Sequence, residues 1–313
     1  MALQTQIREN FPEQKVSLFS QLRKEHLLAG IAGGTTSTLL LHPLDLIKIR
    51  FAVNEGATRS LNRPQYNGVF DAFGSIYRTE GIRGLYQGVV PNILGAGSAW
   101  GLYFFFYNAV KSWLQEGDPR RDLGPAVHLA AATNSGVLTL ALTNPIWVVK
   151  TRLCLQYDAS CKNYHGFVQT LGKIYRAEGV RGWYKGFVPG LFGVSHGALQ
   201  FMAYEEMKTQ YNLSLGRNTD HRLETLEYLA FGGLSKIFAT MTTYPYQVLR
   251  ARLQDQHRQY RGVLDVIRQI RTHEGFVGFY KGLVPNLLRV TPATAITFFV
   301  YESIISMFTP KSN

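Results

Sequence analysis

The sequence predicts an all-α membrane protein in which six transmembrane helices form three tandem repeats and close into a pseudo-threefold barrel. Three observations lead to this prediction. A motif that begins with proline occurs three times at an interval of about 100 residues. Each repeat contains two apolar segments long enough to cross a bilayer. The excess positive charge is confined to the connections within the repeats.

The repeat is defined by three separate motifs that share one period. The first motif starts at Pro43, Pro145 and Pro245, which are 102 and 100 residues apart. A Glu-Gly pair and an aromatic-x-Gly turn follow each copy, and a Tyr-Asn or Tyr-Glu pair ends each unit. Agreement among three motifs indicates three copies of one unit. The expected divisions are a tail over 1–22 and repeats over 23–118, 119–214 and 215–313.

Each repeat begins and ends with a candidate membrane span. In the first repeat, His42 and Asp45 are the only residues with ionisable side chains in the segment 27–47. Residues 89–110 contain no Asp, Glu, Lys, Arg or His. Both segments can cross a hydrocarbon core of about 30 Å. A short amphipathic helix is expected in each connection. The equivalent spans are 128–149, 187–204, 228–249 and 283–301.

Charge is sorted between the connections and the remainder of the chain. The connections 46–88, 148–187 and 248–281 hold 20 basic and 8 acidic residues, an excess equal to the net charge of +12. The other residues hold 13 of each sign. Membrane proteins concentrate Lys and Arg in the loops on one side of the bilayer. Soluble helical repeats have no reason to sort charge in this way. Both termini are therefore expected on the side opposite the connections.

Composition excludes several other classes. An apolar fraction of 46% excludes disorder, and two cysteines, Cys154 and Cys161, cannot form a disulfide framework. Metal-spaced histidines, a P-loop and a dinucleotide-binding glycine motif are all missing, so neither an enzyme nor a metal or prosthetic group is expected. Residues 1–25 lack an apolar targeting segment. The alternative class is a soluble basic helical-repeat protein that binds nucleic acid, which solubility without detergent would identify.

The Pro-x-[Asp/Glu]-x-x-[Lys/Arg]-x-[Lys/Arg] motif in triplicate resembles that of the mitochondrial carrier family over essentially the whole chain. The resemblance implies a monomeric, multi-pass protein of the mitochondrial inner membrane, with its short helices in the matrix and both termini in the intermembrane space. It also implies contact with anionic lipid such as cardiolipin on the matrix side, and no nucleic-acid partner. A peroxisomal address is the rival location.

Residues 144–153 resemble the branch of this family that moves nucleotides, NAD, flavin and folate. The resemblance therefore implies FAD, folate or both as the transported substrate. NAD and a pyrimidine nucleotide remain open as alternatives, because the residues themselves indicate only an anionic, aromatic and sizeable ligand.

The family pattern implies a matrix gate below the three prolines, which are expected to kink their helices. Each acidic position would pair with the basic position of the next repeat. Trp147 replaces the second acid and would be limited to a cation–π contact, unless it is an interfacial anchor. Gln247 replaces the third acid and would be limited to a hydrogen bond. The expected pairs are Asp45–Lys150, Trp147–Arg250 and Gln247–Lys48.

A cytoplasmic gate is implied by the aromatic-[Asp/Glu]-x-x-[Lys/Arg] positions of the second helix in each repeat. Only one of its three pairs unites an acid with a base, so this gate also departs from the family pattern. The alternative is that these residues are ordinary interfacial charges. The pairs are Glu302–Lys111, Asn108–Lys208 and Glu205–Ile305.

Two cations in apolar helices are candidates for substrate binding. Arg289 suits phosphate or carboxylate, although it could instead cap a helix turn near Pro292. Lys236 interrupts a stripe of small residues and would bind an anion or extend to the interface. Gly95, which shares its repeat position with Arg289, would leave room for a ring system. The full set is Arg289, Lys236, Phe192, Gly193, Gly95, Trp147 and Arg250.

Three phenylalanines recur at 97-residue intervals, at positions 104, 201 and 298. They would form either a hydrophobic constriction that passes planar rings or a threefold packing contact.

Overall fold

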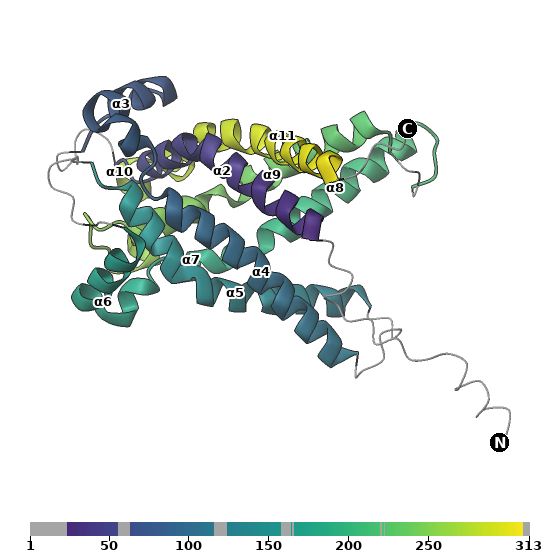
Figure 1. Ribbon diagram of the computed structural model, residues 1–313, viewed down its shortest axis with the longest axis horizontal. Helices are drawn as coiled ribbons and strands as arrows, with labels where there is room; N and C mark the ends of the chain where they lie inside the picture. The colour runs from purple at the N-terminus through teal and green to yellow at the C-terminus, as the bar shows by residue number, and fades with distance from the viewer. Residues whose placement is uncertain are drawn as a thin grey trace, which may run out of the picture. The chain divides into compact units, whose positions relative to one another are not determined.

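The computed structural model describes residues 24–55, 63–115, 124–157, 164, 166–219, 221 and 223–308. The chain divides into two compact units, one of residues 38–293 and one in which residues 1–37 join 294–313. The described part contains helices and no strand, so the all-α prediction is confirmed (Figure 1). The long helices are α2 (Lys24–Ala52), α4 (Val89–Leu114), α5 (Pro125–Cys154), α8 (Ser195–Ser214), α9 (Thr225–Gln254) and α11 (Leu283–Phe308).

Three stretches of the described chain are long and apolar enough to cross a membrane: Val89–Leu114, Ala126–Cys154 and Phe276–Met307. Large apolar side chains on α4 remain exposed, and Trp100 and Trp113 are 65% and 77% accessible. A soluble protein rarely leaves such a surface uncovered, so lipid contact explains it. Gly, Ser and Thr lower the hydropathy of α2 and α9, and Glu205, Glu206 and Lys208 lower that of α8.

The three prolines lie inside α2, α5 and α9, as the repeat predicts. The residue before each proline contacts a backbone carbonyl of the aromatic-x-Gly turn that follows in the same repeat. Three different side chains therefore attach each proline-containing helix to its own connection. The contacts are His42 Nε2 with Gln87 O at 2.8 Å, Asn144 Nδ2 with Trp183 O at 2.7 Å and Lys185 O at 3.4 Å, and Tyr244 Oη with Lys281 O at 3.2 Å.

The connections contain the short helices α3 (Val69–Leu85), α6 (Phe167–Trp183) and α10 (Val263–His273), the last followed by the 3₁₀ helix η2 (Phe276–Tyr280). The glycine of each Glu-Gly pair has a positive φ of 65–68°. L-residues with a side chain rarely adopt this conformation, so glycine is required where the short helix turns. These glycines are Gly81, Gly179 and Gly275.

The apolar core of the 38–293 unit lies between the short helices and the ends of the proline-kinked helices. Ile76 of α3 and Ile270 of α10 are fully buried in one cluster with Leu46 and Val248. Ile174 of α6 is fully buried in a second cluster. The amphipathic helices thus hold the kinked ends in place.

The fourth predicted span is not one continuous helix, which corrects the expectation for 187–204. Helix α7 (Phe187–Phe192) is followed by a turn at Gly193 and Val194 before α8 begins. Backbone N–H groups of Gly193 and His196 donate three residues back, at 2.9 and 3.2 Å, which tightens the chain locally. A Cβ on Gly193 would lie 2.9 Å from Tyr246 Oη, so glycine permits this close approach.

The smaller unit contains the first part of α2 and the last part of α11. A Cβ on Gly33 would lie 2.8 Å from the carbonyl oxygen of Thr297. The glycine therefore lets the two helices approach closely, as small residues do in membrane helices. Phe298 and Glu302 belong to this unit.

Candidate functional site

A buried ion pair joins the kinked helices of the first two repeats. Lys150 Nζ of α5 lies 2.5 Å from Asp45 Oδ2 of α2, and the two side chains are 10% and 7% exposed. Each residue follows its proline, Asp45 by two positions and Lys150 by five, near the C-terminal ends of α2 and α5. This pair occupies the predicted matrix-gate positions of two successive repeats.

Asp45 is shared among several partners. Asn92 Nδ2 of α4 donates to Asp45 Oδ2 at 3.2 Å. Arg289 Nε of α11 lies 3.5 Å from Asp45 Oδ1, but it makes no hydrogen bond to a described residue. The guanidinium is therefore attracted by the carboxylate while one of its N–H groups lacks an acceptor. An unsatisfied buried donor of this kind is costly unless a ligand or water completes it.

The other two predicted matrix pairs differ from each other. Lys48 Nζ donates to Gln247 Oε1 at 2.7 Å, which is the expected hydrogen bond. Arg250 instead donates to Asn144 Oδ1 at 3.2 Å. Among the described cations, Lys150 lies over the Trp147 ring at 5.3 Å, and Arg250 does not. The prediction for Trp147 is corrected in its partner, because Lys150 on the same helix is one turn away and reaches the ring first.

These side chains surround a cavity of about 190 Å³. Lys48, Lys150 and Arg250 line it together with a single carboxylate, that of Asp45. Arg250 Nε, like Arg289 Nε, is buried and has no hydrogen-bond acceptor among the described residues. The site thus has more cationic groups than carboxylates to neutralise them, which favours an anionic ligand.

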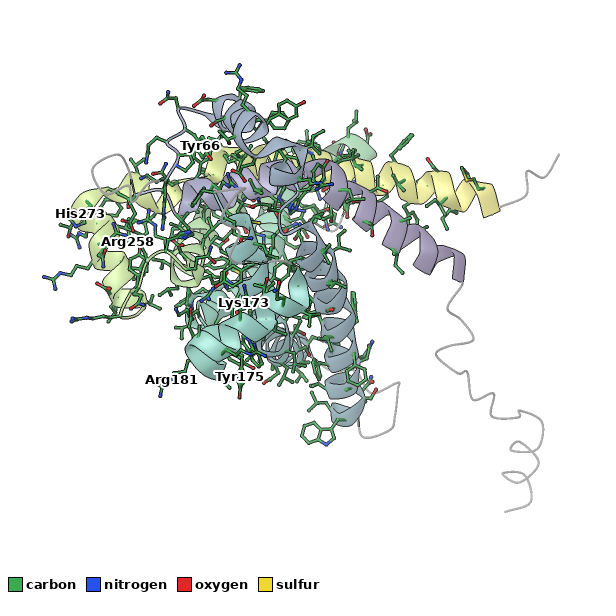
Figure 2. All side chains as sticks on the ribbon, turned by 60° about the vertical axis from the view of Figure 1, so that its left-hand side comes forward. Tyr66, Lys173, Tyr175, Arg181, Arg258 and His273 are labelled. Atoms are coloured by element: carbon green, nitrogen blue, oxygen red, sulfur yellow. The ribbon has the colours of Figure 1, made fainter. Side chains whose placement is uncertain are left out.

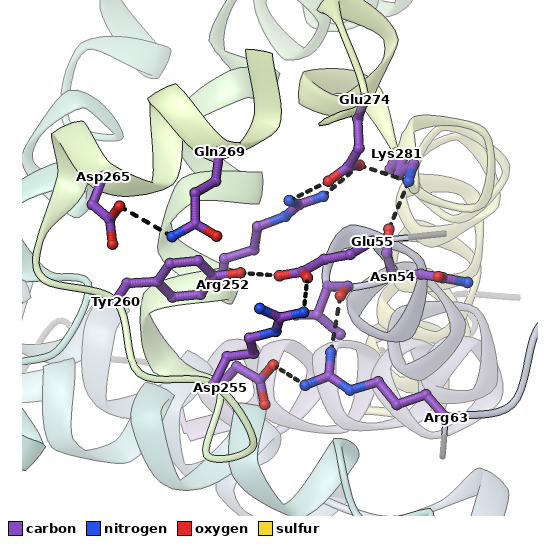
Figure 3. A network of polar contacts seen from close by, with 12 residues as sticks. Asn54, Glu55, Arg63, Arg252, Asp255, Tyr260, Asp265, Gln269, Glu274 and Lys281 are labelled. Carbon is purple, nitrogen blue, oxygen red and sulfur yellow. Dashed lines mark hydrogen bonds and ion pairs between the residues drawn. The ribbon is translucent and has the colours of Figure 1, made fainter. Parts of the chain in front are cut away.

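A second set of arginines closes a ring around the same ends of α2, α5 and α9. Each arginine pairs with the glutamate of the Glu-Gly motif in its own repeat and donates to a backbone carbonyl of the next repeat in cyclic order. Figure 3 shows the third repeat, where Arg252 contacts both Glu274 oxygens and Glu274 also meets Lys281. The set is Arg50–Glu80 with Cys154 O, Arg152–Glu178 with Gln254 O, and Arg252–Glu274 with Ala52 O.

Two glutamates of this ring, Glu178 and Glu274, are held in their charged form. Burial by itself would raise the pKa of Glu274, but hydrogen bonds from Arg252 and Lys281 outweigh it and lower the pKa. The pKa of Glu178 is lowered in the same way by Arg152 and Lys185, against a smaller degree of burial. The Arg152–Glu178 and Arg252–Glu274 pairs are therefore ionic at neutral pH.

The predicted substrate-contact residues fall into two groups: glycines that pack against aromatic rings, and side chains with groups available to a ligand. Gly95 does not open a space, because a Cβ there would lie 3.3 Å from the Trp147 ring; it lets that ring pack closely against α4. Gly193 likewise packs against Tyr246. Phe192 is 65% exposed. Burial and the charge of Arg289 act on Lys236, which makes no hydrogen bond or ion pair with a described residue. Arg289, Phe192 and Lys236 therefore have groups available to a ligand.

The cytoplasmic-gate residues remain partly untested. Lys208 lies 3.8 Å from Glu205 on its own helix, α8. Asn108 and Lys208 make no contact with each other in the described part of the chain. Glu302 and Ile305 belong to the smaller unit, so their pairings with Lys111 and Glu205 stay predictions.

Sequence reasoning missed Asn92, which bridges Asp45 and His42, and the role of the arginine ring. Asn92 Nδ2 lies 3.3 Å from His42 Nδ1 as well as within reach of Asp45. A signal for Asn92 existed, since a Pro-Asn pair recurs at Asn286. The ring was also marked by three basic residues seven positions after the prolines and by three Glu-Gly pairs.

Apolar helices long enough to cross a membrane, a cavity lined by cations and an ionic ring together indicate a membrane transport protein. The Mitochondrial carrier protein family model matches residues 24–118, 121–214 and 221–312. The chain belongs to the mitochondrial carrier family, whose members are transporters rather than enzymes.

Several relatives match nearly the full chain. The chloroplastic Folate transporter 1 of Arabidopsis thaliana is 43% identical over 90% of this chain and 95% of its own length. The chloroplastic nicotinamide adenine dinucleotide transporter 1 of the same plant is 38% identical, with 88% and 89% covered. A mitochondrial FAD carrier protein of Saccharomyces cerevisiae is 34% identical, with 91% and 97% covered.

Proposed function

We propose that the protein carries FAD, folate or both across the mitochondrial inner membrane by alternating access. The observation that carries this proposal is the pair of buried guanidinium N–H groups, on Arg250 and Arg289, that lack acceptors beside a single carboxylate. A phosphate or carboxylate of the substrate would supply those acceptors. Similarity to a folate transporter and an FAD carrier supports these two substrates.

Arg289 would act first on the substrate anion. Its ion pair with Asp45 is long, and its Nε–H is unsatisfied, so a substrate oxygen competes for the guanidinium at little cost. Lys236 would add a second cation, and the exposed Phe192 ring would contact the heterocycle. Trp147 and Arg250 would complete the proposed contact set, whereas Gly95 and Gly193 act as packing positions against Trp147 and Tyr246.

The gate would open when Asp45 and Lys150 separate. An anion that holds Arg289 removes one of the two cations that stabilise Asp45 in the closed form. The bound substrate would thereby favour the transition between the two open states, which is the differential affinity that alternating access requires. Glu302–Lys111 would be the strongest pair of the opposite, cytoplasmic gate.

We further propose that the connections face the matrix and both termini face the intermembrane space. Basic side chains project from the short helices, as Figure 2 shows for Arg181 on α6, and they would meet anionic lipid such as cardiolipin. The chain would act as a monomer, with repeats over 23–118, 119–214 and 215–313. Protease treatment of sealed mitochondria should cleave the termini only after the outer membrane is opened, and cleavage of the connections under the same conditions would contradict this orientation.

Reconstitution tests the substrate. The purified full chain in liposomes loaded with FAD, folate, NAD or a pyrimidine nucleotide should show saturable uptake of FAD or folate. Arg289→Ala should lower the uptake rate at least about tenfold, since a charge-assisted hydrogen bond contributes about 1.5–3 kcal/mol. Arg271→Ala, which removes an exposed arginine from α10, is the matched control and should leave uptake unchanged.

NAD is the competing substrate, because two nicotinamide adenine dinucleotide transporters of 38% and 36% identity also match nearly the full chain. Selective uptake of NAD, with neither FAD nor folate transported, would replace the proposed substrate by NAD.

A further inference from the structure

A groove lies between α8 and α9. It has a volume of about 440 Å³ and lies away from the cation-lined cavity, sharing none of its lining residues. The two helices pack along each other in the 38–293 unit (Figure 1). Its lining consists of Gly197, Gln200, Phe201, Tyr204, Tyr228, Gly232 and Ser235.

The repeat register explains why this groove is open. Trp100 and Tyr103 stand 97 residues before Gly197 and Gln200, at the same positions of α4. In the first repeat their rings are occupied in stacked pairs, Trp100 with Phe104 at 5.8 Å and Tyr103 with Tyr107 at 6.2 Å. In the second repeat the indole is replaced by a hydrogen atom and the phenol by an amide.

The open groove has room and chemistry for a flat ring. A Cβ at Gly197 or Gly232 would have no heavy atom within 4 Å, so both helices leave space there. The rings of Tyr204 and Tyr228 meet edge to face, with centroids 5.8 Å apart. Phe201 is 64% exposed beside them. Aromatic faces next to an empty volume favour stacking of a planar ligand.

Gln200 adds hydrogen-bonding capacity at the same place. Its amide has no hydrogen-bond partner among the described residues, so both its donor and its acceptor are available. Heterocycles such as pteridine and isoalloxazine present a donor–acceptor edge that an amide can match. A merely apolar void would have no reason to replace the tyrosine of the first repeat with glutamine.

We propose that the α8–α9 groove is the binding site for the heteroaromatic ring of the transported anion, with Gln200 reading the polar edge of the ring. This inference rests on the proposed function, because it assigns the ring of the same substrate whose anionic groups bind Arg289. The two ends of one elongated molecule would thus contact two different places in the 38–293 unit.

The test uses a matched pair of adjacent glycines on α9. Gly232 lines the groove, whereas Gly233 is exposed elsewhere and its Cβ would also be free of contacts. Leucine at either position changes helix propensity and volume equally, but only Gly232→Leu fills the groove. Gln200→Leu removes the amide without filling the groove, and thermal unfolding of each variant confirms that it is folded.

The probe is lumiflavin, which contains the isoalloxazine ring without the phosphate chain. Its binding to the purified full chain is measured by the quenching of its fluorescence. Wild type and Gly233→Leu should bind it equally, and Gly232→Leu should bind it at least about tenfold more weakly, equivalent to about 1.4 kcal/mol. Equal affinity of the two leucine variants, or no binding by wild type, would overturn the groove assignment. If the groove effect is present but liposomes take up neither FAD nor folate, the ring site stands and the proposed function fails.

Discussion

Replacement of Glu274 by glutamine tests whether the arginine ring stabilises the closed helix ends. Arg252 meets Glu274 through two parallel contacts, Nη1 to Oε1 at 2.5 Å and Nη2 to Oε2 at 2.7 Å. A glutamine there would keep one acceptor but would turn its NH₂ group toward a guanidinium N–H. The side chains are 1% and 5% exposed, so solvent cannot compensate.

The second repeat supplies an internal comparison. Glu178 uses a single oxygen, Oε2, for both Arg152 at 2.8 Å and Lys185 at 2.9 Å, and its side chain is 26% exposed. Glutamine at 178 can place its carbonyl oxygen at that point. Loss of one partner of a buried pair costs about 3–5 kcal/mol, whereas exposed pairs contribute about 1 kcal/mol or less. Because the Arg152 side chain is 1% exposed and that of Glu178 is 26% exposed, the loss at position 178 should lie between these two values.

The assay measures thermal unfolding in detergent. Unfolding is monitored by the labelling of a buried thiol, which reacts only when the protein unfolds. Cys154 is fully buried and free, and Cys161→Ser leaves it as the sole reporter. At roughly 2–4 °C per kcal/mol, Glu274→Gln should lower Tm by about 6 °C or more. Glu178→Gln should lower it by clearly less than Glu274→Gln does.

Equal Tm losses for the two glutamine variants would refute this reasoning, because the bidentate geometry and the deeper burial of Glu274 would then have no energetic effect. A loss confined to Glu178→Gln would refute it still more strongly.

Three further predictions concern charge at the gates and the ring. The pKa of Glu274 is lowered, so the stabilisation that this carboxylate provides is complete above its ordinary pKa of 4.5 and is lost as pH falls through the lowered pKa. The Tm difference between wild type and Glu274→Gln should therefore narrow only below about pH 4.5. A constant difference down to pH 3 would contradict this. Gln247→Glu converts the 2.7 Å hydrogen bond with Lys48 into an ion pair; if it stabilises the closed matrix gate by about 1 kcal/mol, uptake should slow roughly fivefold while Tm rises, and faster uptake would argue against a gate at this position. Lys111→Glu should impair uptake and Glu302→Lys should restore it in the double variant, whereas absence of rescue in the liposome assay would show that the two residues are not paired.

Much of the architecture was accessible from the sequence because it depends on periodic signals. The proline motif, the Glu-Gly pairs and the apolar spans repeat three times, so chance agreement at one position could not mislead the assignment. The interruption at Gly193 was not accessible, since a glycine in an apolar segment is also compatible with a continuous helix. Its consequence depends on Tyr246, which approaches from another helix.

The candidate site also combines features that the sequence predicted with features that it could not predict. Spacing after the prolines, together with family resemblance, was sufficient to associate Asp45 with Lys150, because a kink places residues two and five positions later near the neighbouring helices. It could not select the partner of Trp147, since competition between two cations is decided by distances in three dimensions.

The sequence by itself therefore determined the three repeats, the kinked helices and the excess of cations over acids, because each depends on residue type and interval along the chain. Only the tertiary structure decided that Asn92 bridges Asp45 and His42, that three arginines bond carbonyls of neighbouring repeats, and that a groove opens beside Gly197. The Asn92 and arginine contacts join residues about 50 to 200 positions apart, and the groove joins two separate helices, so the linear chain carries no distance information for any of them.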